Sequence, residues 1–229
     1  MEARLSSPTD IAGFRSEARQ LLAHQVPPHE VTWTLSPHAF QGVVQRRAQE
    51  SRRQPIARAA TSIVPASFLR LCEYVAQHHD ADRFALLYRL LWRLVHEPGL
   101  RHDASDPDLS RAQHMAHAVR RDIHKLKANA RFHPVADPAR PGEPIHMAWC
   151  EPAHHVLETV ASWFAKRQAA IRWALFTPER SAYWDGRQLH YANGGGHLSV
   201  TMPEAEWLAR WQQVFRDGAQ PEAGSHAGA

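Results

Sequence analysis

Residues 111–131 constrain this sequence most, because they divide into an apolar set and a basic set at helical spacing. The apolar residues recur every three or four positions: Ala112, Met115, Ala116, Val119, Ile123 and Leu126. On an α-helix they form one stripe, which predicts a helix packed against a core. The opposite side of that helix carries the basic set: His117, Arg120, Arg121, His124 and Lys127. The segment has a formal charge of +5, whereas the whole chain has +4.

A concentration of cations on one helix has two interpretations. It can hold the phosphate groups of a polyanion, or it can be an ordinary solvated surface, which is the commoner case. The residues alone leave both open.

The length of 229 residues and the hydrophobic content of 44% are sufficient for one well-buried core. We therefore expect a single domain over residues 1–217 and a disordered tail over residues 218–229, which are rich in Gly, Ala and polar side chains. No apolar run approaches the roughly 20 residues that cross a bilayer, and the first residues lack an export pattern. A cytoplasmic protein without membrane contact is expected.

The first hundred residues predict mainly helices, from apolar positions at helical spacing. Helices are expected over residues 10–25, 65–78 and 83–96, and short strands over residues 3–6 and 31–35. The strand at 31–35 follows from the alternation of Val31, Trp33 and Leu35 with two threonines. Residues 83–96 are apolar on most of the helix circumference, which favours a central buried helix.

After residue 131 the pattern changes to β-structure. Strands are expected over residues 132–135, 145–150, 172–177, 181–185 and 188–191, and helices over 153–168 and 203–216. Asp185-Gly186 is a strong two-residue turn signal for an antiparallel hairpin. The predicted class is α+β, with a helical bundle packed on a small, mostly antiparallel sheet.

Two arginines interrupt the apolar helix at 83–96. Arg89, Arg93 and His96 lie along one line of that helix. Such a line either meets carboxylates of the same fold or faces a groove that holds a phosphate or an acidic ligand. A similar choice, between a solvated loop and a loop that closes on a polyanion, concerns five further arginines: Arg46, Arg47, Arg52, Arg53 and Arg58.

The densest group of reactive side chains lies at residues 149–155, where a predicted strand meets a predicted helix. Backbone N–H groups at a helix start attract anions. Glu151 with His154 or His155 is a candidate general acid/base pair, although a Glu at this position also simply favours the helix dipole. Asp122 and His124, on the basic helix, are candidates for orienting a substrate.

No cofactor and no metal site is predicted. Cys150, His154 and His155 lack the ligand spacing of structural zinc sites, and the sequence has no C-x-x-C pair. Cys72 and Cys150 are expected to be reduced, buried thiols. Phosphate-binding loops, Gly-rich dinucleotide turns and G-x-S-x-G elbows are also absent from the sequence.

Five motifs follow one another along the chain: RFALLYRLLWRL at 83–94, DPD at 106–108, MAHAVRRDIHKLKANARF at 115–132, WCEPAHHVLE at 149–158 and RWALFTPERSAYWDG at 172–186. Together they resemble a bacterial family of domains of unknown function that is assigned to DNA metabolism or DNA repair. Members of that family occur alone, paired with a radical-SAM protein, or fused ahead of a uracil-DNA-glycosylase-like domain. The resemblance implies a DNA-repair context.

The chain departs from that family in two places. Members usually have an aromatic and a β-branched residue where this chain has Asn129 and Ala130. They also continue past the last helix with an aromatic pair, an Asn-Pro element and a basic stretch, whereas this chain ends in a short polar tail. Contacts made by those parts are expected to be lost or to come from a partner.

We therefore expect a DNA-repair or DNA-metabolism protein that works beside a separate catalytic partner, such as a radical-SAM protein or a glycosylase. Its nucleic acid, single- or double-stranded, is expected to contact six cations: Arg120, Arg121, Lys125 and Lys127, with help from Arg89 and Arg93.

Two alternatives belong to other classes. The first is an enzyme, glycosylase-like or hydrolytic, that acts on damaged or modified nucleotides with Glu151 and His154 as acid and base. The second is a protein-interaction adaptor that docks through the C-terminal helix around Trp207 and Trp211.

Overall fold

The computed structural model describes residues 1–35, 64–97, 99–100, 103, 105–194 and 202–216. The five arginines between residues 46 and 58 and the tail at 218–229 lie outside this part of the chain. Two compact units are present: Met1–Asp122 with Ala153–His155, and Ile123–Pro152 with Val156–Ala229. The single domain over residues 1–217 stays a prediction.

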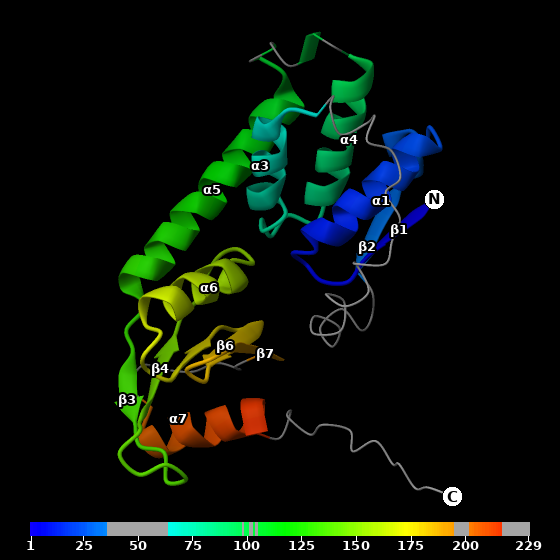
Figure 1. The fold of residues 1–229 in the computed structure, drawn as a ribbon. Coiled ribbons are helices and arrows are strands. Elements are labelled where there is room, and N and C mark those ends of the chain that lie inside the picture. The colour runs from blue at the N-terminus through cyan, green and yellow to red at the C-terminus, as the bar shows by residue number, and fades with distance from the viewer. Residues whose placement is uncertain (36–63, 98, 101–102, 104, 195–201, 217–229) are drawn as a thin grey trace, which may run out of the picture. The chain divides into compact units, whose positions relative to one another are not determined.

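The first unit is mainly helical (Figure 1). Its elements are β1 (Glu2–Leu5), α1 (Ile11–Ala23), the 3₁₀ turn η1 (Pro28–Glu30), β2 (Thr32–Leu35), α3 (Ala66–Val75), α4 (Arg83–His96) and the first part of α5 (Pro107–Asn129). Strands β1 and β2 pair in parallel. Asp10 caps α1 by accepting the N–H of Gly13 at 2.8 Å.

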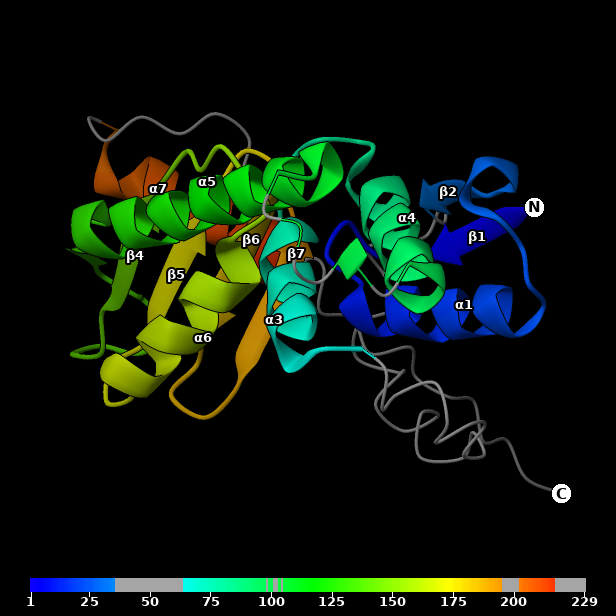
Figure 2. The ribbon, with the colours of Figure 1, turned by 90° about the horizontal axis from the view of Figure 1, so that it is seen from above.

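Helix α4 forms the centre of this unit, as its apolar circumference predicts, with α3 and α1 on either side of it (Figures 1 and 2). Its leucines at positions 86, 87 and 90 are at most 1% exposed. The ring of Phe14 in α1 lies 5.6 Å from that of Phe84 and 5.1 Å from that of Trp33 in β2. The Tyr88 hydroxyl donates a 2.6 Å hydrogen bond to the Val26 carbonyl, which satisfies its one buried polar atom.

Helix α5 starts at an acidic turn that binds α4. Asp106 caps the helix by accepting the Leu109 N–H at 2.9 Å, and it also pairs with Arg93 at 2.7 Å. Asp108, in the first turn of α5, accepts two hydrogen bonds from Arg89, at 2.6 and 2.8 Å. These ion pairs fix the start of α5 against α4, because each guanidinium group has a defined carboxylate partner.

The second unit contains a five-stranded sheet in the order β3-β4-β5-β6-β7. Its elements are β3 (His133–Val135), β4 (Ile145–Trp149), α6 (Leu157–Arg167), β5 (Trp173–Phe176), β6 (Arg180–Trp184), β7 (Leu189–Asn193), α7 (Glu204–Trp211) and the short π-helix η5 (Gln212–Arg216). All neighbouring strands are antiparallel except β4 and β5, which are joined through α6 and pair in parallel. The α+β class with a mostly antiparallel sheet is therefore confirmed.

Helices α6 and α7 lie on opposite faces of the sheet (Figure 1). Met147 of β4 and Phe176 of β5 form one buried cluster with Trp207 and Trp211 of α7. Trp173 has the opposite parity in β5, and its ring lies 6.0 Å from that of Phe164 in α6. Both faces of the central strands are thus covered, which explains why β5 is apolar throughout.

One predicted boundary is wrong: the helix expected from residue 153 begins at Leu157. Two backbone donors of the preceding segment have partners elsewhere. The His154 N–H is bound by the Asp122 carboxylate at 3.0 Å, and the His155 N–H by the Gln77 carbonyl at 2.9 Å. These tertiary hydrogen bonds replace the first turn of the expected helix.

Arg93→Met is expected to lower the free energy of unfolding by about 1–3 kcal/mol, because it leaves the 4%-exposed Asp106 without its cation. The Arg93 guanidinium lowers the pKa of Asp106 below its usual value. This stabilisation is therefore complete above the usual Asp pKa of about 4 and is lost as the pH falls below it. Urea unfolding of both proteins at pH 7 and at acid pH measures both effects.

The matched control is Arg140→Met, which removes an exposed cation of the β3–β4 loop. It should change stability by less than about 0.5 kcal/mol at any pH. Equal stability of the Arg93 and Arg140 variants would show that the α4–α5 ion pairs do not stabilise the fold.

Candidate functional site

The basic face of α5 consists of Arg120, Arg121, Lys125 and Lys127. The first three are exposed and Lys127 is half-buried. The apolar stripe predicted on the other side is buried, with Val119 at 0% and Ile123 at 8% exposure. Within the described residues, none of the four cations forms an ion pair with a carboxylate. The positive charge of this face is thus not neutralised by the described part of the fold.

Two of these cations rest on aromatic rings. The Arg120 guanidinium lies 4.3 Å from the centre of the Tyr74 ring, and the Lys127 ammonium lies 5.0 Å from that of Trp163. A cation over a ring face is attracted to it while its outer hydrogen-bond donors stay accessible. The two contacts therefore restrict the side chains without occupying their donors, which favours binding of an external anion.

Arg89 and Arg93 have a different environment. Arg89 pairs with Asp108, and Arg93 pairs with Asp106, Asp108 and Glu97. Of the two alternatives for this line of the helix, the structure therefore contains the one with carboxylates of the same fold. Their part in nucleic-acid binding stays a prediction that would require these ion pairs to be shared or broken.

The candidate acid/base residues at 149–155 have separate hydrogen-bond partners. Glu151 is exposed, and its carboxylate accepts the indole N–H of Trp149 at 3.3 Å. Burial raises the pKa of Cys150 to about 11, so that its thiol stays protonated at neutral pH. His124 is exposed on α5. In this structure Asp122 binds the backbone instead of orienting a substrate, because its carboxylate accepts the His154 N–H.

His154 joins two histidines that the sequence analysis did not single out. His78 and His79 follow the end of α3, and one ring nitrogen from each of the three histidines lies within 4.8 Å of the others. The Nδ1 atoms of His79 and His154 are 3.0 Å apart. The three rings are stacked or tilted against one another, with centres 4.3 to 5.0 Å apart. We call this group the histidine cluster.

Burial favours the neutral imidazole of two members of the cluster, His78 and His154. Burial is the main cause that lowers the pKa of His78, to about 4, and the neighbouring His154 and His79 lower it further. Burial also lowers the pKa of His154, against the opposing effect of Asp122. Each neutral ring has one nitrogen with a lone pair, which a metal ligand or a proton acceptor requires.

No local signal in the sequence links His78 and His79 to His154. His78 and His79 lie 76 and 75 positions before His154, and a His-His dipeptide alone has no specific meaning. Hydrogen bonds of His154 to Asp122 and His79, and of His155 to Gln77, bring the segments together.

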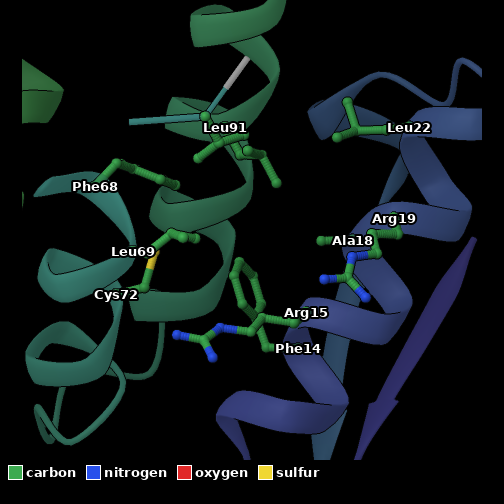
Figure 3. Close-up of a pocket in the computed structure, with 10 residues that line it drawn as sticks. Phe14, Arg15, Ala18, Arg19, Leu22, Phe68, Leu69, Cys72 and Leu91 are labelled. Carbon is green, nitrogen blue, oxygen red and sulfur yellow. The ribbon is translucent and has the colours of Figure 1, made fainter. Parts of the chain in front are cut away.

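An apolar pocket lies between α1, α3 and α4 (Figure 3). Its lining is almost entirely apolar, with Arg15 and Arg19 of α1 at its edge. Arg15 donates to Glu73 at 3.0 Å, and burial raises the pKa of Cys72 to about 12. The described lining of the pocket thus offers apolar contact and no acid/base group poised near neutral pH.

Among the described residues, no helix is both long enough and apolar enough to cross a membrane.

Comparison with known families places the chain among domains of unknown function. A family model described as a domain of unknown function, DUF4130, matches residues 81–223, from α4 to beyond η5. The match covers more than half of the chain, which therefore belongs to this family. No curated protein and no solved structure matches the chain.

Asp122→Ala is expected to release residues 153–155, because the buried His154 N–H loses its acceptor. We expect a loss of about 1–2 kcal/mol in unfolding free energy and faster hydrogen exchange of the His154 amide. Asp122→Asn is the matched control, since its side-chain oxygen can still accept this hydrogen bond. Slow exchange retained in Asp122→Ala would show that the carboxylate does not hold the segment.

Proposed function

We propose that the basic face of α5 binds the phosphate backbone of a nucleic acid and that the protein serves DNA repair or DNA metabolism beside a separate catalytic partner. The observation that carries this proposal is the set of four cations on one helix for which the described residues provide no carboxylate. Cations on a neighbouring element, α4, are neutralised instead.

The energetics favour an external polyanion. Lys125 follows one helical turn after Arg121, so these two like charges repel each other, and Arg120 adds a third charge beside them. Phosphates relieve this repulsion and release condensed counterions from the nucleic acid, which drives sequence-independent binding. Contacts of this kind position a nucleic acid without reading its bases.

The DNA context comes from the sequence resemblance, which covers the motif that contains this face. The family to which the chain belongs has no assigned activity. A radical-SAM protein or a glycosylase as partner is part of the same proposal, since the chain lacks a recognisable nucleotide-binding or nucleophile motif of its own.

Arg120→Ala/Arg121→Ala is expected to weaken DNA binding by about tenfold at physiological salt and to reduce the slope of log K against log salt by up to about 1.8 for a duplex, or 1.4 for a single strand. Fluorescence anisotropy with one labelled oligonucleotide in both strand states, at four or more salt concentrations, measures both quantities. The size of the change in slope also indicates which strand state is bound.

The matched control, Arg140→Ala/Arg187→Ala, removes the same charge from two exposed loop positions. It should retain the wild-type affinity to within about twofold and most of the salt slope, because only the general field changes. An equal loss in both double variants would mean that net charge alone drives binding. An unchanged affinity and slope in the α5 variant would contradict the proposal.

The catalytic alternative, with Glu151 and His154 as acid and base, stays a prediction. The Glu151 carboxylate accepts a hydrogen bond from Trp149, and the His154 ring contacts His78 and His79. These contacts give no specific support to a shared substrate.

A further inference from the structure

We propose that His78, His79 and His154 bind a divalent transition-metal ion, with Zn²⁺ the best-suited candidate. Imidazole nitrogen is a preferred ligand of zinc, copper, iron and nickel, and the cluster offers three such groups from two chain segments within one unit. This inference goes beyond the proposed nucleic-acid binding and does not depend on it.

The distances between the ligand nitrogens need only small changes to suit a metal ion. Zinc binds imidazole nitrogen at about 2.0–2.1 Å, so two ligands of a tetrahedral ion are roughly 3.3 Å apart. The Nδ1 atoms of His79 and His154 face each other at 3.0 Å, and the three ligand atoms lie within 4.8 Å of one another. Without a metal, one ring can donate its Nδ1–H to the Nδ1 lone pair of the other, and a metal ion bound by both nitrogens would take the place of that proton.

Hydrogen bonds of the backbone hold the residues that carry the ligand rings. His154 is fixed by the hydrogen bond of its N–H to Asp122, and the next residue, His155, by that of its N–H to the Gln77 carbonyl. Gln77 directly precedes His78, so this second hydrogen bond joins the two segments that carry the ligands. The three imidazoles are therefore brought together before any metal binds, which reduces the entropy lost on binding.

The charge around the cluster is also compatible with a cation. The nearest carboxylate on the same turn, Asp80, is paired with Arg111 at 2.7 Å, so the negative charge of that pair is balanced. His79 is exposed, which leaves the cluster open to ions from solvent.

The three ligands are not equivalent. Nδ1 of His78 accepts the N–H of Asp80 at 3.1 Å, so this ring must give up a hydrogen bond or turn before it ligates through that atom. Nδ1 of His154 accepts the His79 N–H only at the longer distance of 3.4 Å, and it already faces Nδ1 of His79 at 3.0 Å. We therefore expect His79 and His154 to contribute more to metal affinity than His78.

Within the described part of the chain the cluster provides three protein ligands, which leave the fourth tetrahedral position of zinc open. In structural zinc sites all four positions are occupied by the protein, whereas sites with three protein ligands hold a water molecule that zinc makes more acidic. The arrangement therefore corresponds to a site that can bind an exogenous oxygen ligand, such as water or a phosphate oxygen.

The test is a titration of the chelator-treated, tag-free full chain with Zn²⁺ and with Co²⁺. Calorimetry is expected to give one saturable site, and Co²⁺ should produce visible absorption bands of an intensity typical of four-coordination. His79→Ala and His154→Ala should each weaken binding at least about tenfold. His78→Ala should weaken it by a smaller factor.

His124→Ala is the matched control, because His124 is an exposed imidazole on α5 outside the cluster. The metal affinity of this variant should equal that of the wild type. His79 is exposed as well, so His79→Ala is expected to keep its fold, which circular dichroism verifies. If His154→Ala does not fold, the metal affinity of His79→Ala decides the outcome. Absence of a saturable 1:1 site, or equal affinity of His79→Ala and His124→Ala, would overturn the proposal.

Discussion

The ion pairs between the start of α5 and α4 determine where unbalanced positive charge lies in the described part of this protein. Asp106 and Asp108 neutralise Arg89 and Arg93 with contacts as short as 2.6 Å. Beyond these two acids, α5 has a single further carboxylate, Asp122. That carboxylate binds the backbone N–H of His154. The cations from Arg120 onward are therefore left facing solvent on a helix whose other side is fixed in the core.

Asp122 connects the two features of functional interest. It follows Arg121 directly on α5, and through its hydrogen bond it holds the segment that carries His154. Within the described residues its carboxylate forms no ion pair with the neighbouring cations. Asp122 thus lies next to the positive charge of α5 and also supports the approach of His154 to His78 and His79. The proposals for the two sites nevertheless rest on different side chains and have separate tests.

The sequence predicted what depends on local periodicity. The buried stripe of α5, the central position of α4 and the hairpin at Asp185-Gly186 are each specified within a few residues, and each is confirmed. Contacts between distant residues were not predictable in this way. The choice between a carboxylate and an external ligand for Arg89 and Arg93 depended on the packing of a second helix. The late start of α6 and the histidine cluster both depend on hydrogen bonds across 32 or more positions.

The central claim is that the basic face of α5 is the surface that contacts nucleic acid. Photocrosslinking tests it most directly, with a photoreactive amino acid placed singly at position 117 on α5 and at position 187 in the β6–β7 turn, both of which are exposed. We predict that a labelled oligonucleotide crosslinks at position 117 and that the yield of this crosslink falls steeply as salt is raised. Position 187 should give little crosslinked product. Equal crosslinking at both positions, or crosslinking at 187 alone, would contradict the account.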